Sequence, residues 1–374
     1  MSAVDLQNSL ITVNVNLSGV PVPEAGFGTV LLVSPDAAPG GSDLVLTYSS
    51  ATAAVALAAD LTANKITATI KAAVEKGFAQ NPRPATIKVA KVSALVVPSA
   101  LAVDMAAIVV QDNDWYGICL DCSATNAPIA VQATVDANIV ALAGWAETQQ
   151  KLFLAMAFDV NIYAADGGAA LDIKALSYEN SALLWSQMVA TGYPGTAFQA
   201  ADMAALCRWL AYDPNTISAP FRASLTGILR ARTTLAGLDL TSAQIALAQG
   251  HNANLGLLYG SAACFLDKGV NANGRAWEEV LSKHWLQARV REDLASTVVD
   301  LANRGRKFPL TQEGVAICKG ILARRFQQGV SGAHFTDYEI GAGTINTTTK
   351  AITLAASATV LDNARSFTFN IEFL

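Results

Sequence analysis

The sequence predicts a mixed α/β and α+β protein: an N-terminal α/β domain, a C-terminal α+β core and an extended β-strand arm at each end. Apolar runs alternate with helical segments early in the chain, two long amphipathic helices follow, and both ends alternate apolar with polar residues. The 374 residues suffice for two or three domains. The expected divisions are the first arm with its linker, the α/β domain, the α+β core and the second arm, at 1–25, 26–210, 211–361 and 362–374.

The first arm is predicted from residues 9–18, where every second residue is apolar. The apolar positions are Ile11, Val13, Val15 and Leu17. A period of two gives a strand one apolar face. Segment 18–28 holds two prolines and three glycines, too broken a composition for a helix or a sheet interior. It is expected to be a linker, and it includes Gly19, Pro21, Pro23 and Gly26.

The α/β domain is predicted from short apolar runs that alternate with Ala-rich helical segments. Strands are expected at 29–33, 85–92, 115–122 and 151–159, and helices near 50–60, 65–80 and 132–149. This order indicates a mostly parallel sheet covered by helices. Residues 178–212 are expected to be mostly helical or irregular.

The C-terminal core carries expected helices near 241–250, within 285–303 and at 312–328, and a hairpin or meander at 344–357. The third helix has Thr311 as its expected N-cap and places five apolar residues on one face. These are Val315, Cys318, Ile321, Leu322 and Phe326.

The second arm is predicted from residues 366–373, which alternate without interruption. Its apolar positions are Phe367, Phe369, Ile371 and Phe373. A polar lead-in that contains Asn363 is the expected linker. On pattern alone, each terminal strand either folds back into its own sheet or crosses to the sheet of a neighbouring subunit, and both alternatives remain open.

Charge and hydropathy exclude several partners. Charged residues make up 15% of the chain and the net charge is −5, so no basic stripe is available for nucleic acid. The one cationic run, Arg304, Arg306 and Lys307, is read either as solvated helix ends or as a patch for an acidic neighbour. The apolar stretch 94–110 is interrupted by polar residues and is too short to span a membrane, and no secretion signal is found, so a soluble protein made inside the cell is expected.

Residues that would carry chemistry do not form recognisable motifs. The glycines of 269–274 have the spacing of a phosphate loop but lack its Lys and Ser/Thr, and a turn is the better reading. The three histidines lie far apart, at His251, His284 and His334. Asp112, Asp114 and Asp121 surround an expected strand, which is ordinary for turn residues. We therefore expect no enzyme, no cofactor and no metal site.

The pair Cys119 and Cys122 forms a C-x-x-C motif with no second pair to complete a closed zinc site. Two structural thiols, an inter-subunit disulfide, and metal or redox chemistry are the three readings of this pair, of which structural thiols fit the strand-like surroundings best.

Two C-terminal segments, 252–290 and 306–322, carry a series of residues in a distinctive order and spacing. These are Asn254, Gly256, Gly269, Gly274, Trp285, Lys307, Pro309, Thr311 and Gly314. Weaker matches lie at 26–33, 48–60, 113–118 and 212–216. Together these positions resemble the tail sheath proteins of contractile bacteriophages and related contractile injection systems, over nearly the whole chain.

The resemblance implies a structural subunit that polymerises as stacked hexameric rings, in a helical array around a tail tube, and contracts to drive the tube through the host envelope. Terminal arms would join the sheets of neighbouring subunits. The implied partners are further copies of the chain, the tail tube protein, and baseplate and tail terminator proteins, without nucleic acid or membrane. The implied location is the virion tail, assembled in the host bacterial cytoplasm. A tube or baseplate component is the alternative, and an α/β enzyme is disfavoured for want of convergent catalytic residues.

Overall fold

The computed structural model describes residues 9–10, 26–93, 98–121, 132–157, 160–165, 168–185, 200–228, 239–257, 264–348 and 350–361. The chain divides into two compact units. The α/β unit comprises Gly26–Asp213 and Pro220–Trp277. The C-terminal unit contains Pro214–Ala219, the chain from Glu278 onward and the N-terminal residues before Gly26.

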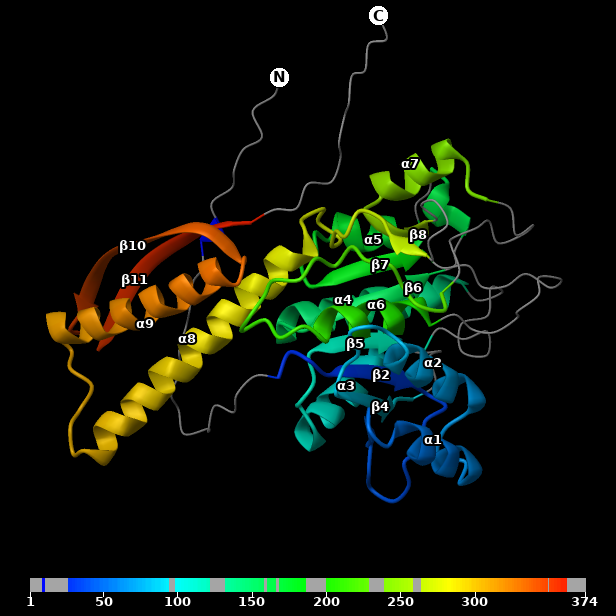
Figure 1. Cartoon of the computed structure of the whole chain (residues 1–374), viewed down its shortest axis with the longest axis horizontal. Helices are drawn as coiled ribbons and strands as arrows, with labels where there is room; N and C mark the ends of the chain where they lie inside the picture. Colours follow the sequence, from blue (N-terminus) through cyan, green and yellow to red (C-terminus); the bar gives the residue numbers. More distant parts are fainter. Residues whose placement is uncertain are drawn as a thin grey trace, which may run out of the picture. The chain divides into compact units, whose positions relative to one another are not determined.

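The α/β unit is built on an eight-stranded sheet with the order β3-β4-β2-β5-β6-β7-β8-β9 (Figure 1). The six inner strands, β4, β2, β5, β6, β7 and β8, are parallel. The two outer strands, β3 and β9, are antiparallel to their neighbours. The strands are β2 (Val30–Ser34), β3 (Val45–Ser49), β4 (Thr86–Lys91), β5 (Gly117–Leu120), β6 (Leu152–Ala157), β7 (Ser181–Trp185), β8 (Ala253–Leu257) and β9 (Phe265–Leu266).

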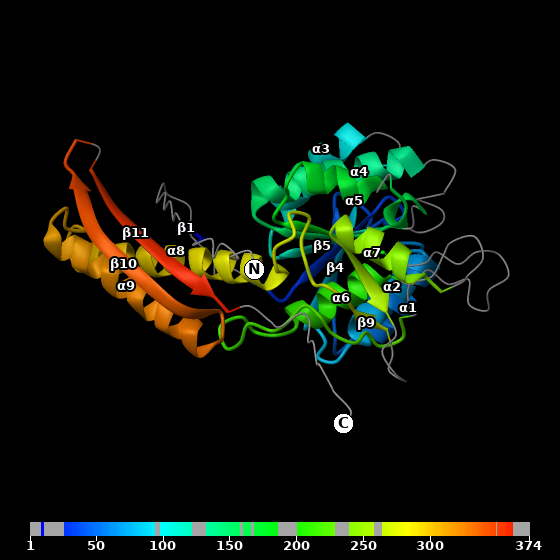
Figure 2. The same ribbon diagram turned by 90° about the horizontal axis from the view of Figure 1, so that it is seen from above.

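Helices cover both faces of this sheet, which explains why its central strands are continuous apolar runs. Figure 2 shows α3, α4 and α5 on one face, and α1, α2 and α6 on the other. The helices of the unit are α1 (Ala53–Thr62), α2 (Ala68–Phe78), α3 (Pro98–Gln111), α4 (Gln132–Gln149), α5 (Gly168–Ala175), α6 (Ala201–Leu210) and α7 (Ser242–Gly250), with a 3-10 turn η2 (Val160–Tyr163). All five residues of β2 are buried, as expected for a strand at the centre of two helical layers.

The C-terminal unit packs two long helices against a hairpin (Figure 1). The helices are α8 (Trp277–Asn303) and α9 (Gln312–Ser331), and the hairpin strands are β10 (Phe335–Asn346) and β11 (Ala351–Val360). A short strand β1 (Ser9–Leu10) completes a three-stranded sheet with the order β1-β11-β10. The apolar stripe of α9 faces this sheet: Phe326 is fully buried and stacks 4.9 Å from the ring of Tyr338 on β10.

The prediction of a mixed α/β and α+β protein is confirmed at that level. The detail differs in several places. Residues 178–212 were expected to be mostly helical or irregular, yet they include the parallel strand β7 as well as helix α6. Strand β3 and helices α3 and α5 were not predicted. The hairpin was expected at 344–357, whereas its strands extend from Phe335 to Val360. Short apolar runs do not distinguish a buried strand from a helix, which accounts for β7.

Two further points concern a helix end and the grouping of residues 220–277. Thr311 is the N-cap residue of α9, as predicted, although its side chain makes no capping hydrogen bond. Residues Pro220–Trp277 group with the α/β unit because β8 pairs with β7 and extends its sheet. The division into two domains and two terminal arms stays a prediction.

Candidate functional site

The hairpin of the C-terminal unit has one buried face and one exposed face. On β11, Ala356 and Ala358 are buried, whereas Thr353, Ala355 and Thr359 are exposed. This alternation follows from the period of two along a strand. The buried face lies against the helices, so the exposed face and the strand edges are what the hairpin presents to its surroundings.

The edges of this sheet are sparsely paired in the described part of the chain. β11 pairs with β10 along its whole length on one side, but on the other side only with β1, opposite Ala358 and Ser357. No described strand continues along the rest of that edge, and none pairs with the outer edge of β10. Such edges present unpaired backbone donors and acceptors, and they add strands from other segments or other chains.

An apolar crevice of about 90 Å³ lies inside the C-terminal unit, between α8, α9 and β11. Its lining is entirely apolar apart from one thiol and consists of Leu286, Val290, Leu294, Cys318, Leu322, Phe326, Ile352, Leu354 and Ala356. Leu294, Cys318, Ile352 and Leu354 are only half-buried. The crevice is therefore incompletely covered on its β11 side by the residues that the structure describes.

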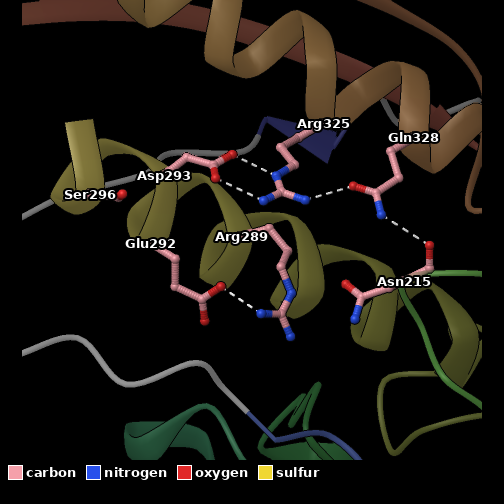
Figure 3. A pocket seen from close by; sticks show the side chains of 7 residues that line it. All are labelled: Asn215, Arg289, Glu292, Asp293, Ser296, Arg325 and Gln328. Atoms are coloured by element: carbon pink, nitrogen blue, oxygen red, sulfur yellow. Dashed lines mark hydrogen bonds and ion pairs between the residues drawn. The ribbon is translucent and has the colours of Figure 1, made fainter. Parts of the chain in front are cut away.

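A polar groove of about 450 Å³ opens beside the same helices (Figure 3). Arg325 of α9 donates two hydrogen bonds to the carboxylate of Asp293 on α8, at 2.6 and 2.8 Å, and a third to Gln328 at 2.7 Å. Burial raises the pKa of Asp293, but hydrogen bonds from Arg325 and Arg324 outweigh it and leave the pKa below its usual value. The two-pronged ion pair fixes α9 on α8.

The segment Pro214–Ala219 contributes Asn215 to this groove and is hydrogen-bonded to both helices. Trp285 donates from Nε1 to Oδ1 of Asn215 at 3.0 Å, and Gln328 donates to the Asn215 carbonyl at 3.0 Å. His334 stacks on Trp285 with the ring centroids 4.6 Å apart, and its Nε2 donates to the Pro214 carbonyl at 2.7 Å. Since Nε2 carries the proton, Nδ1 accepts from the Ser282 hydroxyl at 2.7 Å. Burial lowers the pKa of His334, so the neutral ring fits this site.

The predicted arm and linker residues lie almost wholly outside the described residues. This applies to the apolar positions Ile11, Val13, Val15, Leu17, Phe367, Phe369, Ile371 and Phe373, and to the linker positions Gly19, Pro21, Pro23 and Asn363. Gly26 is described: it is exposed, and a Cβ at this position would lie 2.9 Å from the Asp114 carboxylate. The inter-subunit roles of these residues stay predictions.

The two cysteines of the C-x-x-C pair differ in what is known of them. Cys119 is fully buried in β5, at the centre of the parallel sheet, where a thiol acts as a small apolar side chain. Cys122 lies outside the described residues. The cationic run is partly neutralised, because Arg304 pairs with Asp300 at 2.8 Å and Arg306 lies 3.6 Å from Glu313.

The remaining residues considered from the sequence are spread over the fold. Gly269 and Gly274 have positive φ values of 64° and 88° and flank a tight turn, the reading favoured over a phosphate loop. Asp112 and Asp114 precede β5, whereas Asp121 follows it and accepts a hydrogen bond from Ser34 at 2.6 Å. Among the described residues, no three His, Cys, Asp or Glu side chains are grouped to hold a metal ion, and no helix is long and apolar enough to cross a membrane.

Sequence reasoning found the apolar stripe of α9 but missed the groove and the crevice. Asp293 and Arg325 are 32 residues apart, and Asn215 joins them from a different segment of the chain. The two helices could each be predicted from the sequence, because α8 and α9 are both long. The pairing of the two helices was not, because periodicity shows which face is buried and not what it is buried against.

The sequence matches no protein-family model and no curated protein. Solved structures do match. A chain of the anti-feeding prophage baseplate in its contracted state aligns with a TM-score of 0.57 and 14% identity, over 100% of this chain and 98% of that one. A sheath tail protein from Listeria innocua aligns with a TM-score of 0.57 and 9% identity, over 91% and 94% of the two chains. A sheath tail protein from Desulfitobacterium hafniense gives 0.50 and 11%, over 94% and 100%.

The chain has the fold of tail sheath proteins. The matches extend over both units, so the likeness is not limited to the parallel sheet, an arrangement that many unrelated proteins share. This sheath-like fold is what the order of residues in 252–290 and 306–322 had indicated. Of those positions, Gly314 shows a clear physical reason for its identity, because a Cβ there would lie 1.9 Å from the Pro309 carbonyl oxygen.

Proposed function

We propose that the protein is the structural subunit of a contractile tail sheath. The observation that carries the proposal is the match to sheath tail proteins over at least 91% of the chain, in both units. In this proposal the subunits form stacked hexameric rings in a helical array around a tail tube, with baseplate and terminator proteins at the ends. The site of action is the virion tail, and the role is structural rather than catalytic.

Assembly is proposed to rest on strand exchange at the C-terminal hairpin. The outer edge of β10 and most of the outer edge of β11 carry no strand within the described residues, so they are suited to accept one. The two alternating segments at 9–18 and 366–373 are the proposed donors. A head-to-tail contact of this kind does not close on itself and generates a helical array.

Contraction is proposed to be a rigid-body rearrangement between two packings of the array. The paired strands would stay paired while the linkers at 18–28 and 362–365 absorb the movement. A difference of about 1–3 kcal/mol per subunit, the size of a modest allosteric coupling, would sum to a large release over many subunits. This mechanism consumes no nucleotide.

Electron microscopy of the purified protein tests the proposal. We expect hollow tubes wider than a bare tail tube, and persistent monomers at all concentrations would refute it. Deletion of 365–374 should leave a folded monomer that does not polymerise. A matched pair of variants tests whether the apolar face of this segment is what matters. Serine at Phe367, Phe369, Ile371 and Phe373 should abolish tubes, and alanine at Ser366, Thr368 and Asn370 should not.

A baseplate component is the second candidate, because one of the matching chains belongs to a baseplate structure. Such a component would assemble as discrete rings or as part of a defined complex. The same micrographs distinguish the two candidates, because a purified sheath subunit is expected to form tubes of variable length and a baseplate component is not.

A further inference from the structure

We propose that the outer faces of α1 and α3 pack against each other between neighbouring copies of this chain, so that α1 of one copy lies on α3 of the next. The inference rests on the proposed function, because the array brings the copies together. It adds a contact that is made by the α/β unit, beside the strand pairing proposed for the C-terminal hairpin.

Helix α3 has two apolar faces. Its inner face is buried through Leu101, Met105 and Ile108. The exposed residues of its outer face recur at i, i+3, i+4 and i+7, and they are Val103, Ala106, Ala107 and Val110. The two valines are 70% and 89% exposed. This spacing is that of a coiled-coil seam, and a helix that is apolar on all sides is normally buried.

Helix α1 repeats this arrangement on the opposite face of the sheet (Figure 2). Its inner residue Leu57 is fully buried. The exposed outer residues have the same spacing as those of α3, and they are Val55, Ala58, Ala59 and Thr62. Val55 is 77% exposed. The α/β unit therefore presents two outward seams of the same kind, one on each of its helical layers.

Neither seam carries a charge. The only charged residue of α3 is Asp104, whose carboxylate accepts hydrogen bonds from the backbone nitrogen of Ser93 at 2.6 Å and from its hydroxyl at 3.3 Å. The only charged residue of α1 is Asp60, which accepts a hydrogen bond from the Tyr48 hydroxyl at 3.0 Å. Both carboxylates are thus engaged within the unit, and the seams stay neutral.

The neighbouring helix α2 shows that this neutrality is particular to α1 and α3. It lies on the same face of the sheet as α1 and has almost the same length. Its surface nevertheless carries Lys71 and Glu75, which form an ion pair four residues apart, and Lys76. Such an outer face is ordinary for a helix that faces solvent.

The side-chain sizes on the two seams are complementary. Val103 and Val110 stand at the two ends of the α3 seam, and Ala106 and Ala107 leave a shallow site between them. Val55 of α1 can enter this site as a knob enters a hole. The contact removes exposed apolar surface from water on both helices and leaves no charged group buried.

A second copy of the chain is the occupant that this arrangement favours. The two seams lie on opposite faces of one unit, and a contact between two different patches repeats from copy to copy. The 14 residues of α3 span about 21 Å. A single pair of helices of this length buries far less than the roughly 1,600 Å² of a stable complex. The seam is therefore too small to capture a free partner and suits copies that an array already holds close together.

Crosslinking of full-length cysteine variants tests the contact. One double variant carries Val55→Cys with Ala106→Cys, and the control double variant carries Glu75→Cys on α2 with Ala106→Cys. The single variants control for native thiols. With a short bis-thiol reagent under conditions of assembly, we expect the first double variant to give a ladder of dimers, trimers and longer chains. The control double variant and the single variants should react at the background level.

The products separate this inference from the proposed function. Dimers from Ala106→Cys alone would show that α3 contacts itself about a two-fold axis, and they would overturn the inference. Absence of the ladder also overturns it. If tubes form normally in that sample, the sheath function stands without this contact, whereas absence of both the ladder and the tubes counts against both proposals.

Charge substitution gives a second measurement of the same contact. Val55→Glu should raise the protein concentration needed for assembly severalfold, because it brings a charge into an apolar contact. Adding Ala106→Lys should restore assembly, and adding Ala106→Glu should weaken it further, because the two positions meet between copies. Both positions are exposed, so the melting temperature of the unassembled variants should not change. Equal assembly of the two double variants would contradict the contact.

Discussion

The β-sheets of the two units differ in how far helices and neighbouring strands cover them. In the α/β unit, helices cover both faces of the sheet, the strand β2 is completely buried, and antiparallel strands lie at both ends. In the C-terminal unit, helices α8 and α9 pack on the hairpin, its other face is exposed, and its edges are sparsely paired within the described residues. Within the described residues, the second sheet therefore leaves one face uncovered as well as its strand edges, and uncovered strand edges can pair with further strands.

The two units also differ in the elements that their ion pairs and charged side chains join. In the α/β unit, Lys88 forms an ion pair with Asp112 at 2.7 Å, and Lys151 lies over the ring of Trp115. Both lysines therefore contact the segment that immediately precedes β5. In the C-terminal unit, Asp293 and Arg325 join two helices instead. The ion pair of Lys88 thus joins segments of the parallel sheet, whereas the half-buried pair of Asp293 and Arg325 joins the two helices beside the hairpin.

The largest predicted effect concerns helix α9, which packs on the hairpin. Gly314→Ala places a Cβ 1.9 Å from the backbone oxygen of Pro309, where no flexible side chain can yield. We expect a loss of about 3 kcal/mol or more in the free energy of unfolding of the C-terminal unit, at the upper end of overpacking penalties. Calorimetry of the purified variant measures it.

Gly320→Ala is the matched control, because it lies on the same helix and has no atom within 4 Å of the added Cβ. It should stabilise the protein by up to about 1 kcal/mol, since alanine is the better helix former. Equal effects of the two variants would contradict the close approach at Gly314.

The ion pair between α8 and α9 should give the next largest effect. Asp293→Asn removes the charge that accepts two hydrogen bonds from Arg325, with an expected cost of about 1.5–3 kcal/mol. Because the pKa of Asp293 is lowered in the folded protein, its contribution is present above the unfolded pKa and is lost as the pH falls. The difference in free energy of unfolding between the original protein and Asp293→Asn should therefore be present at pH 7 and shrink at acid pH. A difference that stays constant with pH would contradict this role.

Hydrogen exchange tests the comparison between the sheets directly. On assembly, amides at the outer edges of β10 and β11 should become protected by more than about tenfold, which corresponds to 1.4 kcal/mol. Amides of β2, β5 and β6 should not change, because their hydrogen bonds are already complete within the α/β unit. Increased protection in both sheets would mean that the α/β unit also takes part in strand pairing.

The last predicted effect lies in the α/β unit. Burial lowers the pKa of Lys151 to about 7, although Asp114 and Asp112 oppose the shift. Between about pH 7 and the normal lysine pKa near 10.4, the unfolded state binds more protons, so stability should rise with pH in this window. Lys151→Met should remove that dependence, which denaturant unfolding at pH 7 and pH 9 measures. A slope that persists in the variant would assign the dependence to other groups.

The sequence by itself determined which faces of the elements are buried. The stripe of Val315, Cys318, Ile321, Leu322 and Phe326 was predicted from helical spacing. Four of these residues are buried in α9, and Cys318 is half-buried. Helix 132–149 was predicted with the bounds of α4. These features are local, because a period of 3.6 or 2 residues is written into neighbouring positions.

Only the tertiary structure decided which faces meet. The strand order β4-β2-β5, the role of β7, and the junction of Asn215, Asp293 and Arg325 depend on segments far apart in the chain. Periodicity carries no information on the partner of a buried face, and a hydrogen-bonded edge looks the same in sequence as an open one. The pairing of Ser9 and Leu10 with β11 is likewise a long-range contact that no local pattern shows.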